Sequence, residues 1–345
     1  MSASPLASTF SRRVVALHAI ALAWGALAPG WMRAQAASDS GPAAPALWAG
    51  LGRGSYAVGF AVAEADSVTV SIWYPARPRG TPLRLNELES AGAGLSSFME
   101  QHGIPRSAAE RYAGAPLLAR RDAMARRGRF PVILIAQGNQ QGAIDQAVLA
   151  EYLASHGYVV ATTPSPMRRA PMTADSQVGP SAERQARDLE QALAVVGRRP
   201  AADLRRVGVL GHSFGARAAL LLAMREPRVA ALVSLDGGIG TATAMESFRR
   251  APSFDTTRAR APILHFYEEL DDFMHPDFAL LRSLPARDLV LERVTGMHHI
   301  HFATLGFGAA TIPEMAVATR ADAQEPESLR HVAERTLAYF REYLH

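Results

Sequence analysis

The chain has 345 residues, of which 48% are apolar and 20% are charged, the balance of a water-soluble globular protein with one large domain or two small ones. It has no cysteine, which excludes disulfides, iron–sulfur clusters, cysteine-ligated zinc and thiol nucleophiles. All 36 basic residues are arginines, and the lack of lysine excludes a Walker-type phosphate loop, a Schiff-base lysine and a Ser–Lys dyad.

Most of the excess of positive over negative charge lies near the N-terminus. The formal net charge is +4, and Arg12, Arg13 and Arg33 lie in the first 36 residues, which contain no acidic residue. The rest of the chain has 33 arginines and 32 acidic residues, so its net charge is +1. A near-neutral surface without a basic run predicts no nucleic-acid partner.

Residues 1–36 have the pattern of a signal peptide. Two arginines precede an uncharged stretch at residues 14–29, and alanines at 34 and 36 offer a cleavage site for signal peptidase. The apolar stretch is short for a membrane span, which disfavours the alternative of an uncleaved anchor. We therefore expect an exported protein, periplasmic or secreted and without stable membrane insertion. General secretion and twin-arginine export both remain open.

The chain after the signal peptide divides into a linker and one domain. Residues 37–50 are rich in Ala, Ser, Gly and Pro and lack an apolar period, so we expect a flexible linker there. Residues 51–345 show no repeat and no second linker, which predicts a single domain. Within it, residues 83–129 are expected to form a partly helical insertion.

Short apolar or alternating runs in this domain predict strands, and Pro75 is expected to end the first of them. The runs lie at residues 67–74, 130–136, 158–162, 207–210, 230–235, 263–267 and 289–294. Helices are predicted between them at residues 182–196, 214–225 and 327–344. This alternation predicts an α/β fold whose mostly parallel central sheet has helices on both faces, with its chemistry at the carboxyl ends of the strands.

Residues 211–215, Gly-His-Ser-Phe-Gly, lie between a predicted strand and a predicted helix. A sharp strand-to-helix turn needs glycines beside the serine and exposes the serine hydroxyl. The helix N-terminus stabilises negative charge that develops there. We therefore predict that Ser213 is a nucleophile, which an imidazole must activate.

The partners of this serine are sought on later loops. Three histidines follow the last predicted strand, and each is a candidate for the base that activates Ser213. They are His298, His299 and His301. Adjacent histidines without helical H-x-x-x-H spacing disfavour a metal site, so no metal or other cofactor is predicted. Asp236 and Asp271 each follow a strand end, and either is a candidate for the carboxylate that orients the imidazole.

Four segments resemble one group of enzymes. They are the 211–215 pentapeptide, WYPA at residues 73–76, FPVILIAQG at residues 130–138 and LASHGYVV at residues 153–160. In these the chain is similar to α/β-hydrolases of the platelet-activating-factor acetylhydrolase and dienelactone-hydrolase-like group. The resemblance runs from about residue 56 to the C-terminus and is weakest over the insertion. Because dienelactone hydrolase itself uses a cysteine, which this chain lacks, the resemblance implies a serine esterase with an α/β-hydrolase fold.

The resemblance also implies which histidine and which aspartate act together with Ser213. The family pattern Gly-x-x-His-x-x-Phe selects His299 as the base, leaves His298 as the alternative, and gives His301 a structural or pocket role. The acetylhydrolase-like branch places its acid in a Leu-Asp motif at a strand end, which favours Asp236 and leaves Asp271 as the alternative acid.

Two main-chain donors are expected to form an oxyanion hole. One is the N–H of Phe214, which follows the nucleophile, and the other should come from the loop after residues 130–136. The resemblance implies the N–H of Asn139 as this second donor. Gln137 departs from the family's usual His-Gly at this place, although a main-chain donor tolerates the change.

Pocket walls are expected from three regions: residues 164–178, the insertion at residues 83–129 and the loop after Asp236. Three methionines are candidates for an adaptable apolar acyl site, although core packing is their more common use. These are Met167, Met172 and Met297.

Together these features predict an exported serine hydrolase that cleaves small-molecule carboxylic esters. Short acyl groups are expected, as in acetylhydrolases. A polyester or amide hydrolase with the same triad is the enzymatic alternative. A non-catalytic binding protein that retains the fold is the alternative from another class.

Overall fold

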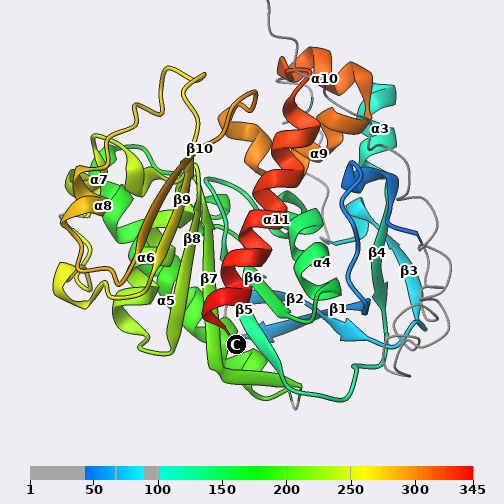
Figure 1. The fold of residues 1–345 in the computed structure, drawn as a ribbon, viewed down its shortest axis with the longest axis horizontal. Coiled ribbons are helices and arrows are strands. Elements are labelled where there is room, and N and C mark those ends of the chain that lie inside the picture. The colour runs from blue at the N-terminus through cyan, green and yellow to red at the C-terminus, as the bar shows by residue number, and fades with distance from the viewer. Residues whose placement is uncertain are drawn as a thin grey trace, which may run out of the picture. The chain divides into compact units, whose positions relative to one another are not determined.

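A computed structural model describes residues 43–66, 68–88, 99, 102–199, 201–248 and 250–344. The predicted signal peptide and residues 37–42 of the predicted linker lie outside the described residues. Ten strands form one sheet in the order β10-β9-β8-β7-β5-β6-β2-β1-β4-β3 (Figure 1). The strands are β1 Ala57–Ala65, β2 Val68–Ala76, β3 Thr81–Arg84, β4 Pro116–Arg121, β5 Phe130–Ala136, β6 Val159–Thr163, β7 Ala202–His212, β8 Val229–Leu235, β9 Ile263–Tyr267 and β10 Leu289–Arg293.

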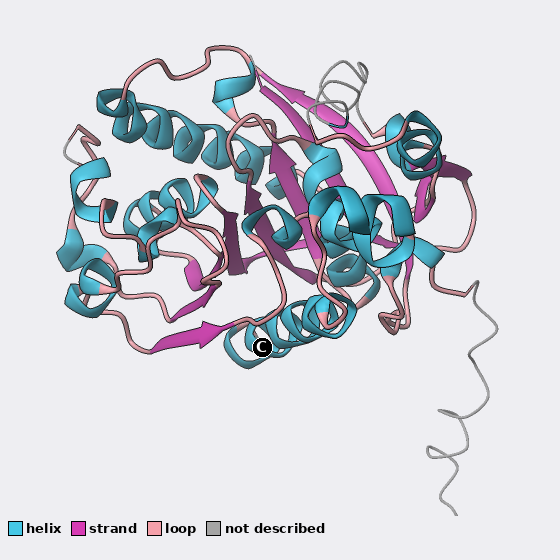
Figure 2. Cartoon of the chain, turned by 90° about the horizontal axis from the view of Figure 1, so that it is seen from above, coloured by secondary structure: helices cyan, strands magenta, loops and turns pink. Residues whose placement is uncertain are grey.

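The sheet is parallel from β6 through β5, β7, β8 and β9 to β10, and β2 joins it antiparallel to β6. Helices cover both faces of the sheet (Figure 2). The helices are α3 Arg106–Ala113, α4 Ala147–Ser155, α5 Val178–Gly197, α6 Gly215–Arg225, α7 Ala244–Ser247, α8 Ala279–Ser283, α9 Thr304–Thr311, α10 Pro313–Thr319 and α11 Glu325–Tyr343. The predicted fold class is confirmed.

Strand β5 shows why the central strands read as continuous apolar runs. Ile133 and Ile135 pack into the core that α4, α9 and α11 share, whereas Val132 and Leu134 pack into the core of α5 and α6 on the opposite face. Because successive side chains of a strand point to opposite faces, a strand covered on both sides needs apolar residues at every position.

Pro75 does not end its strand, contrary to the prediction. β2 continues to Ala76, with Pro75 opposite Val58 of β1. On the other side, β6 pairs with β2 only from Ser71 to Trp73, so Pro75 lies beyond that ladder. Its carbonyl accepts a hydrogen bond of 2.8 Å from the N–H of Arg126. A proline is tolerated at a strand position where no neighbouring strand needs a main-chain N–H from it.

The region predicted as an insertion contributes to the sheet itself. Besides α3, it supplies β4, which pairs in parallel with β1, and the end of β3, which pairs antiparallel with β4. The partly helical insertion predicted for residues 83–129 therefore also contains strands. β4 lies next to the edge strand β3 and ends in two arginines.

The last part of the predicted linker is packed against the domain. Residues 46–48 form a 3₁₀ helix, and Trp48 is fully buried. The indole Nε1–H of Trp48 donates to Glu151 Oε2 over 3.2 Å. The same buried carboxylate accepts the main-chain N–H groups of Leu118 and Ala119 at 3.1 and 2.6 Å. Burial raises the pKa of Glu151 to about 7, and these hydrogen bonds act in the opposite direction. Flexibility was thus the wrong expectation for this segment.

Among the described residues, no helix combines the length and apolarity that crossing a bilayer requires.

Candidate active site

The turn between β7 and α6 presents Ser213 above the sheet. Ser213 has φ 54°, a left-handed conformation that non-glycine residues seldom adopt. A Cβ on Gly215 would lie 2.1 Å from the carbonyl oxygen of Ala136, and a Cβ on Gly211 would lie 2.5 Å from Cα of Ala216. The two glycines are therefore required by the close approach of neighbouring backbone, as the pentapeptide suggests.

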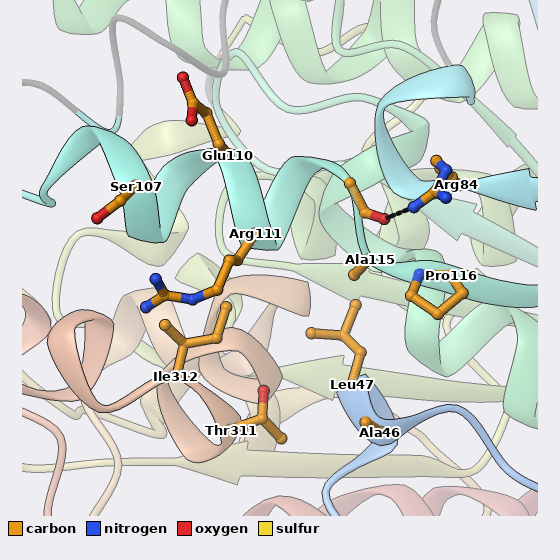
Figure 3. A pocket seen from close by; sticks show the side chains of 11 residues that line it. Ala46, Leu47, Arg84, Ser107, Glu110, Arg111, Ala115, Pro116, Thr311 and Ile312 are labelled. Atoms are coloured by element: carbon orange, nitrogen blue, oxygen red, sulfur yellow. Dashed lines mark hydrogen bonds between the residues drawn. The ribbon is translucent and has the colours of Figure 1, made fainter.

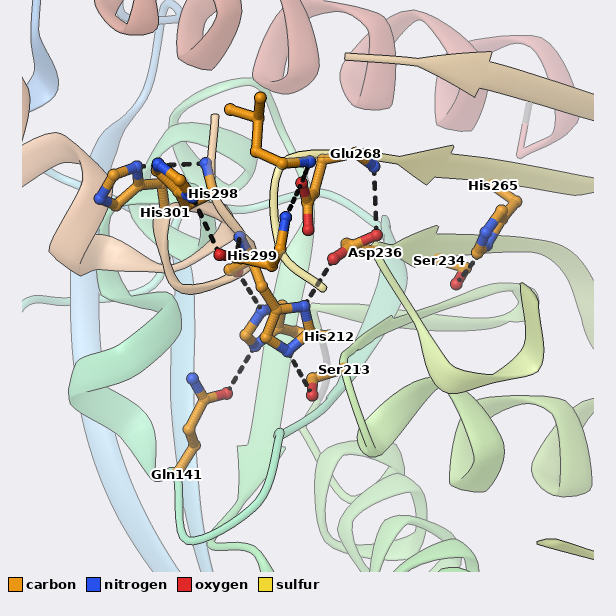
Figure 4. A network of polar contacts seen from close by, with 12 residues as sticks. Gln141, His212, Ser213, Ser234, Asp236, His265, Glu268, His298, His299 and His301 are labelled. Atoms are coloured by element: carbon orange, nitrogen blue, oxygen red, sulfur yellow. Dashed lines mark hydrogen bonds and ion pairs between the residues drawn. The ribbon is translucent and has the colours of Figure 1, made fainter. Parts of the chain in front are cut away.

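The structure brings three predicted residues into one chain of hydrogen bonds (Figure 4). His299 Nε2 lies 2.7 Å from Ser213 Oγ, and His299 Nδ1 lies 2.5 Å from Asp236 Oδ2. Asp236 follows the end of β8, and its Oδ1 accepts the N–H of Glu268 at 3.2 Å. Both His299 and Asp236 are buried, so water competes little for these bonds.

This arrangement fixes the tautomer of His299. A carboxylate only accepts hydrogen bonds, so Nδ1 of His299 carries the proton that faces Asp236. Nε2 is then bare and accepts the hydroxyl proton of Ser213. The geometry is that of a nucleophile next to a general base that a carboxylate holds in place.

The two alternative residues lie beside this chain and contact each other. His298 Nδ1 is 2.9 Å from Asp271 Oδ1, and the main-chain N–H of His299 donates to Asp271 Oδ2 over 2.7 Å. Asp271 therefore holds the backbone of the loop rather than the ring of His299. His301 pairs with Glu325 over 2.9 Å, and both side chains are fully buried, in line with a structural role.

His212 supports the loop from below, a contribution that the sequence did not indicate. Its ring stacks on that of His299 with centroids 5.1 Å apart, and its Nε2 is 3.2 Å from the carbonyl oxygen of His299. Its Nδ1 is 2.8 Å from Gln141 Oε1. Burial, with a smaller effect of His299, lowers the pKa of His212 to about 3. A neutral ring has one N–H, so it donates to only one of these two oxygens. The position of His212 before the serine in the pentapeptide was the signal available for it.

Asn139 and Phe214 both line the cavity in front of Ser213. Among the described residues, neither main-chain N–H has a hydrogen-bond acceptor. The N–H of Gly138 is used differently, since it donates to Gln141 Oε1 over 2.8 Å. Gln137 is buried and donates from Nε2 to Thr162 Oγ1 over 3.0 Å, so its side chain takes part in the packing of the sheet.

A cavity of about 300 Å³ opens at Ser213. Met172 and Val178 come from one predicted wall, and the loop after Asp236 supplies another. The described residues of the 83–129 region contribute nothing to this lining, and Met167 and Met297 lie in the cores. The loop after β9 supplies a wall that the sequence did not predict. The complete lining is Asn139, Met172, Val178, Ser213, Phe214, Arg217, Gly238, Thr241, Ala242, Thr243, Phe273, Met274 and His275.

A larger cavity, of about 650 Å³, lies elsewhere, between α3, α9 and residues 46–47 (Figure 3). Its charged groups are engaged: Arg84 donates to the carbonyl oxygen of Gly114, and Arg111 pairs with Glu314. It contains no serine next to a histidine. Size alone therefore does not identify the reactive site of this protein.

The described part of the chain contains no group of three or more His, Asp or Glu side chains arranged to hold a metal ion.

Comparison with known proteins agrees with the fold. Residues 118–284 match the dienelactone hydrolase family. The chain has the α/β-hydrolase fold and is similar to this family over just under half of its length. A solved structure of ferulic acid esterase from Streptomyces cinnamoneus is similar to this α/β-hydrolase with a TM-score of 0.59 and 18% sequence identity, over 83% of this chain and 88% of that chain. No match was found among curated proteins. The match to this family supports the conclusion that the protein is an ester hydrolase.

Proposed function

We propose that this α/β-hydrolase is an exported serine carboxylester hydrolase that acts on small esters with short acyl groups. The observation that carries the proposal is the unbroken chain from Ser213 Oγ through His299 to Asp236, with distances of 2.7 and 2.5 Å. The order of these residues in the sequence, Ser-Asp-His, is that of α/β-hydrolases.

In the proposed mechanism, Ser213 Oγ attacks the ester carbonyl carbon while His299 Nε2 takes its proton. Asp236 stabilises the imidazolium that forms. The N–H groups of Asn139 and Phe214 bind the oxyanion of the tetrahedral intermediate. When the intermediate collapses, the C–O bond to the alcohol breaks and the alcohol receives the proton from His299. Water then hydrolyses the acyl-enzyme by the same steps.

The size of the cavity supports small substrates. Ligand sites for drug-sized molecules span roughly 300–1,000 Å³, and the cavity at Ser213 is at the lower end at about 300 Å³. Export is supported by the arginine pair, apolar stretch and small-residue site near the N-terminus. N-terminal sequencing of the protein recovered from the periplasm or medium tests export, and a mature chain that begins at residue 37 is expected.

Covalent labelling tests the mechanism directly. A fluorophosphonate should modify wild-type protein at Ser213, as located by peptide mass spectrometry, and Ser213→Ala should abolish both labelling and hydrolysis of 4-nitrophenyl acetate. Ser283→Ala, on α8, is the matched control and should keep both. Full ester hydrolysis by Ser213→Ala would refute the proposal. Amide and polyester substrates in the same assay decide between an esterase and its enzymatic alternatives.

A further inference from the structure

Large apolar side chains are exposed on or directly beside the segments that wall the cavity at Ser213. Phe273 and Leu270, on the loop after β9, are 63% and 50% exposed, and Met245 on α7 is 49% exposed. Only three other large apolar side chains of the described residues are exposed. Phe273 also lines the cavity, so its ring lies where the cavity meets solvent. We call Leu270, Phe273 and Met245 the apolar rim.

Hydrogen bonds hold the loop that carries Phe273 at both of its ends. Near its start, the carboxylate of Glu268 accepts the main-chain N–H of Asp271 over 3.1 Å. Near its end, the N–H of Asp277 donates to the carbonyl oxygen of Gly240, in the loop that forms the other wall, over 2.8 Å. The exposed ring is therefore part of a fixed surface, and exposed apolar surface of this kind is stabilised when an apolar group covers it.

Phe273 also contacts the imidazole that acts on the leaving group. Its ring meets that of His299 edge to face, with centroids 5.1 Å apart and an angle of 85° between the planes. When the tetrahedral intermediate collapses, the C–O bond to the alcohol breaks and the alcohol oxygen takes the proton from Nε2 of His299. This oxygen must then lie within hydrogen-bond distance of Nε2. A group of a few carbon atoms on the same oxygen reaches the ring of Phe273.

The reaction geometry thus gives the two parts of an ester different surroundings. The cavity of about 300 Å³ has to hold the carbonyl group on Ser213 and the acyl part beyond it. The alcohol part starts at Nε2 of His299 and continues toward Phe273, whose ring is mostly exposed. An alcohol larger than the acyl group is accommodated on this side, and an apolar one removes the surface of the ring from water.

We propose that the substrate is an ester of a short acid with a bulky apolar alcohol, and that Phe273 determines specificity for this alcohol part. The ring of Phe273 covers one face of the apolar group on the leaving oxygen, and the rest of the apolar rim extends the surface around it. The inference rests on the proposed ester hydrolysis at Ser213 and adds which part of the substrate the protein selects.

Two esters of nearly identical shape test this inference. Cyclohexylmethyl acetate has an apolar ring in its alcohol part, and in (tetrahydropyran-4-yl)methyl acetate one ether oxygen replaces the far CH₂ group of that ring. Each kcat/KM is divided by the rate constant for alkaline hydrolysis of the same ester, so that intrinsic reactivity cancels. Wild type should then prefer the cyclohexylmethyl ester about fourfold or more, the effect of removing one methylene from water.

Variants of Phe273 assign this preference to its side chain. Phe273→Ala should lower kcat/KM for cyclohexylmethyl acetate about fivefold to thirtyfold and remove the preference, whereas Phe273→Leu should keep part of it because leucine is still apolar. Methyl acetate, whose alcohol part does not reach the ring, should lose several times less. Met124→Ala is the matched control and should keep the preference, because Met124 is also 63% exposed and lies outside the cavity lining.

Three outcomes would overturn the inference. One is a wild-type ratio between the two esters equal to that of alkaline hydrolysis, and this comparison does not depend on the folding of any variant. The second is an equal loss for methyl and cyclohexylmethyl acetate in Phe273→Ala, which would show that the ring only holds His299 in place. The third is no effect of Phe273→Ala. Wild-type protein that a fluorophosphonate labels at Ser213 and that hydrolyses both esters without preference refutes this inference alone, whereas absence of labelling and of hydrolysis refutes the proposed function as well.

Discussion

Asp236 and Asp271 both lie within hydrogen-bond distance of His299, and the structure predicts unequal effects when each is replaced by asparagine. Asp236 Oδ1 accepts the N–H of Glu268, and Oδ2 faces Nδ1 of His299. In Asp236→Asn, the carbonyl oxygen is expected to remain on the N–H of Glu268, so the amide NH₂ faces the imidazole. His299 then carries its proton on Nε2, where it can no longer accept the hydroxyl proton of Ser213.

The expected loss for Asp236→Asn is large. A wrong tautomer and an unstabilised imidazolium together cost about 10⁴-fold in kcat in serine hydrolases, which corresponds to about 5 kcal/mol of activation free energy. Asp271→Asn differs because its carbonyl oxygen can keep the bond to the main-chain N–H of His299. Its side chain is 24% exposed, and we expect a loss of about tenfold or less, since one partly exposed charged hydrogen bond is worth about 1 kcal/mol.

The assay is the steady-state hydrolysis of 4-nitrophenyl acetate by wild type, Asp236→Asn and Asp271→Asn, with circular dichroism to check that each variant is folded. A larger loss of kcat in Asp271→Asn than in Asp236→Asn would refute the assignment of Asp236. It would show that the carboxylate on the loop after β9 orients the imidazole during the reaction.

Two further predictions concern stability. Gly215→Ala should lower the free energy of unfolding by about 3 kcal/mol and reduce ester hydrolysis, because the new Cβ would meet the backbone of β5. Urea denaturation measures the change in stability. Gly52→Ala is the control and should have no such effect, because nothing lies within 4 Å of a Cβ at that position. Burial lowers the pKa of His265 from 6.5 to about 3, so its contribution to stability is present above pH 6.5 and is lost as the pH falls toward 3. His265→Gln should therefore lose roughly 2 kcal/mol less stability than wild type between pH 6.5 and pH 5, and parallel stability curves for the two proteins would contradict this.

The central part of the fold could be predicted from sequence because its strands are buried on both faces. Phe130–Ala136 was predicted with the bounds that the structure shows, since every residue of β5 faces one of two cores. The edge was harder to predict. β4 has arginines at its end and pairs with only short segments of β1 and β3, so its sequence has no clear strand period. Trp48 lies in a composition typical of linkers, and its contact with Glu151 joins residues 103 positions apart.

For the site, the sequence indicated residue types and strand ends but not which groups meet. Asp236 and Asp271 follow neighbouring strands, β8 and β9, and both therefore lie at the same edge of the sheet. Which of the two carboxylates contacts the ring of His299 depends on side-chain positions that only the three-dimensional structure shows.

The N–H groups proposed to bind the oxyanion belong to the polypeptide backbone, and this affects how they can be found. Replacing Asn139 or Phe214 by alanine removes a side chain and leaves the donor in place, so an alanine scan would not reveal the main-chain donor at either position. Related enzymes are likewise free to change the side chains of this loop during evolution without losing the donor. Its detection calls for a change to the amide itself, such as an ester linkage introduced at residue 139 by chemical synthesis or suppressor methods.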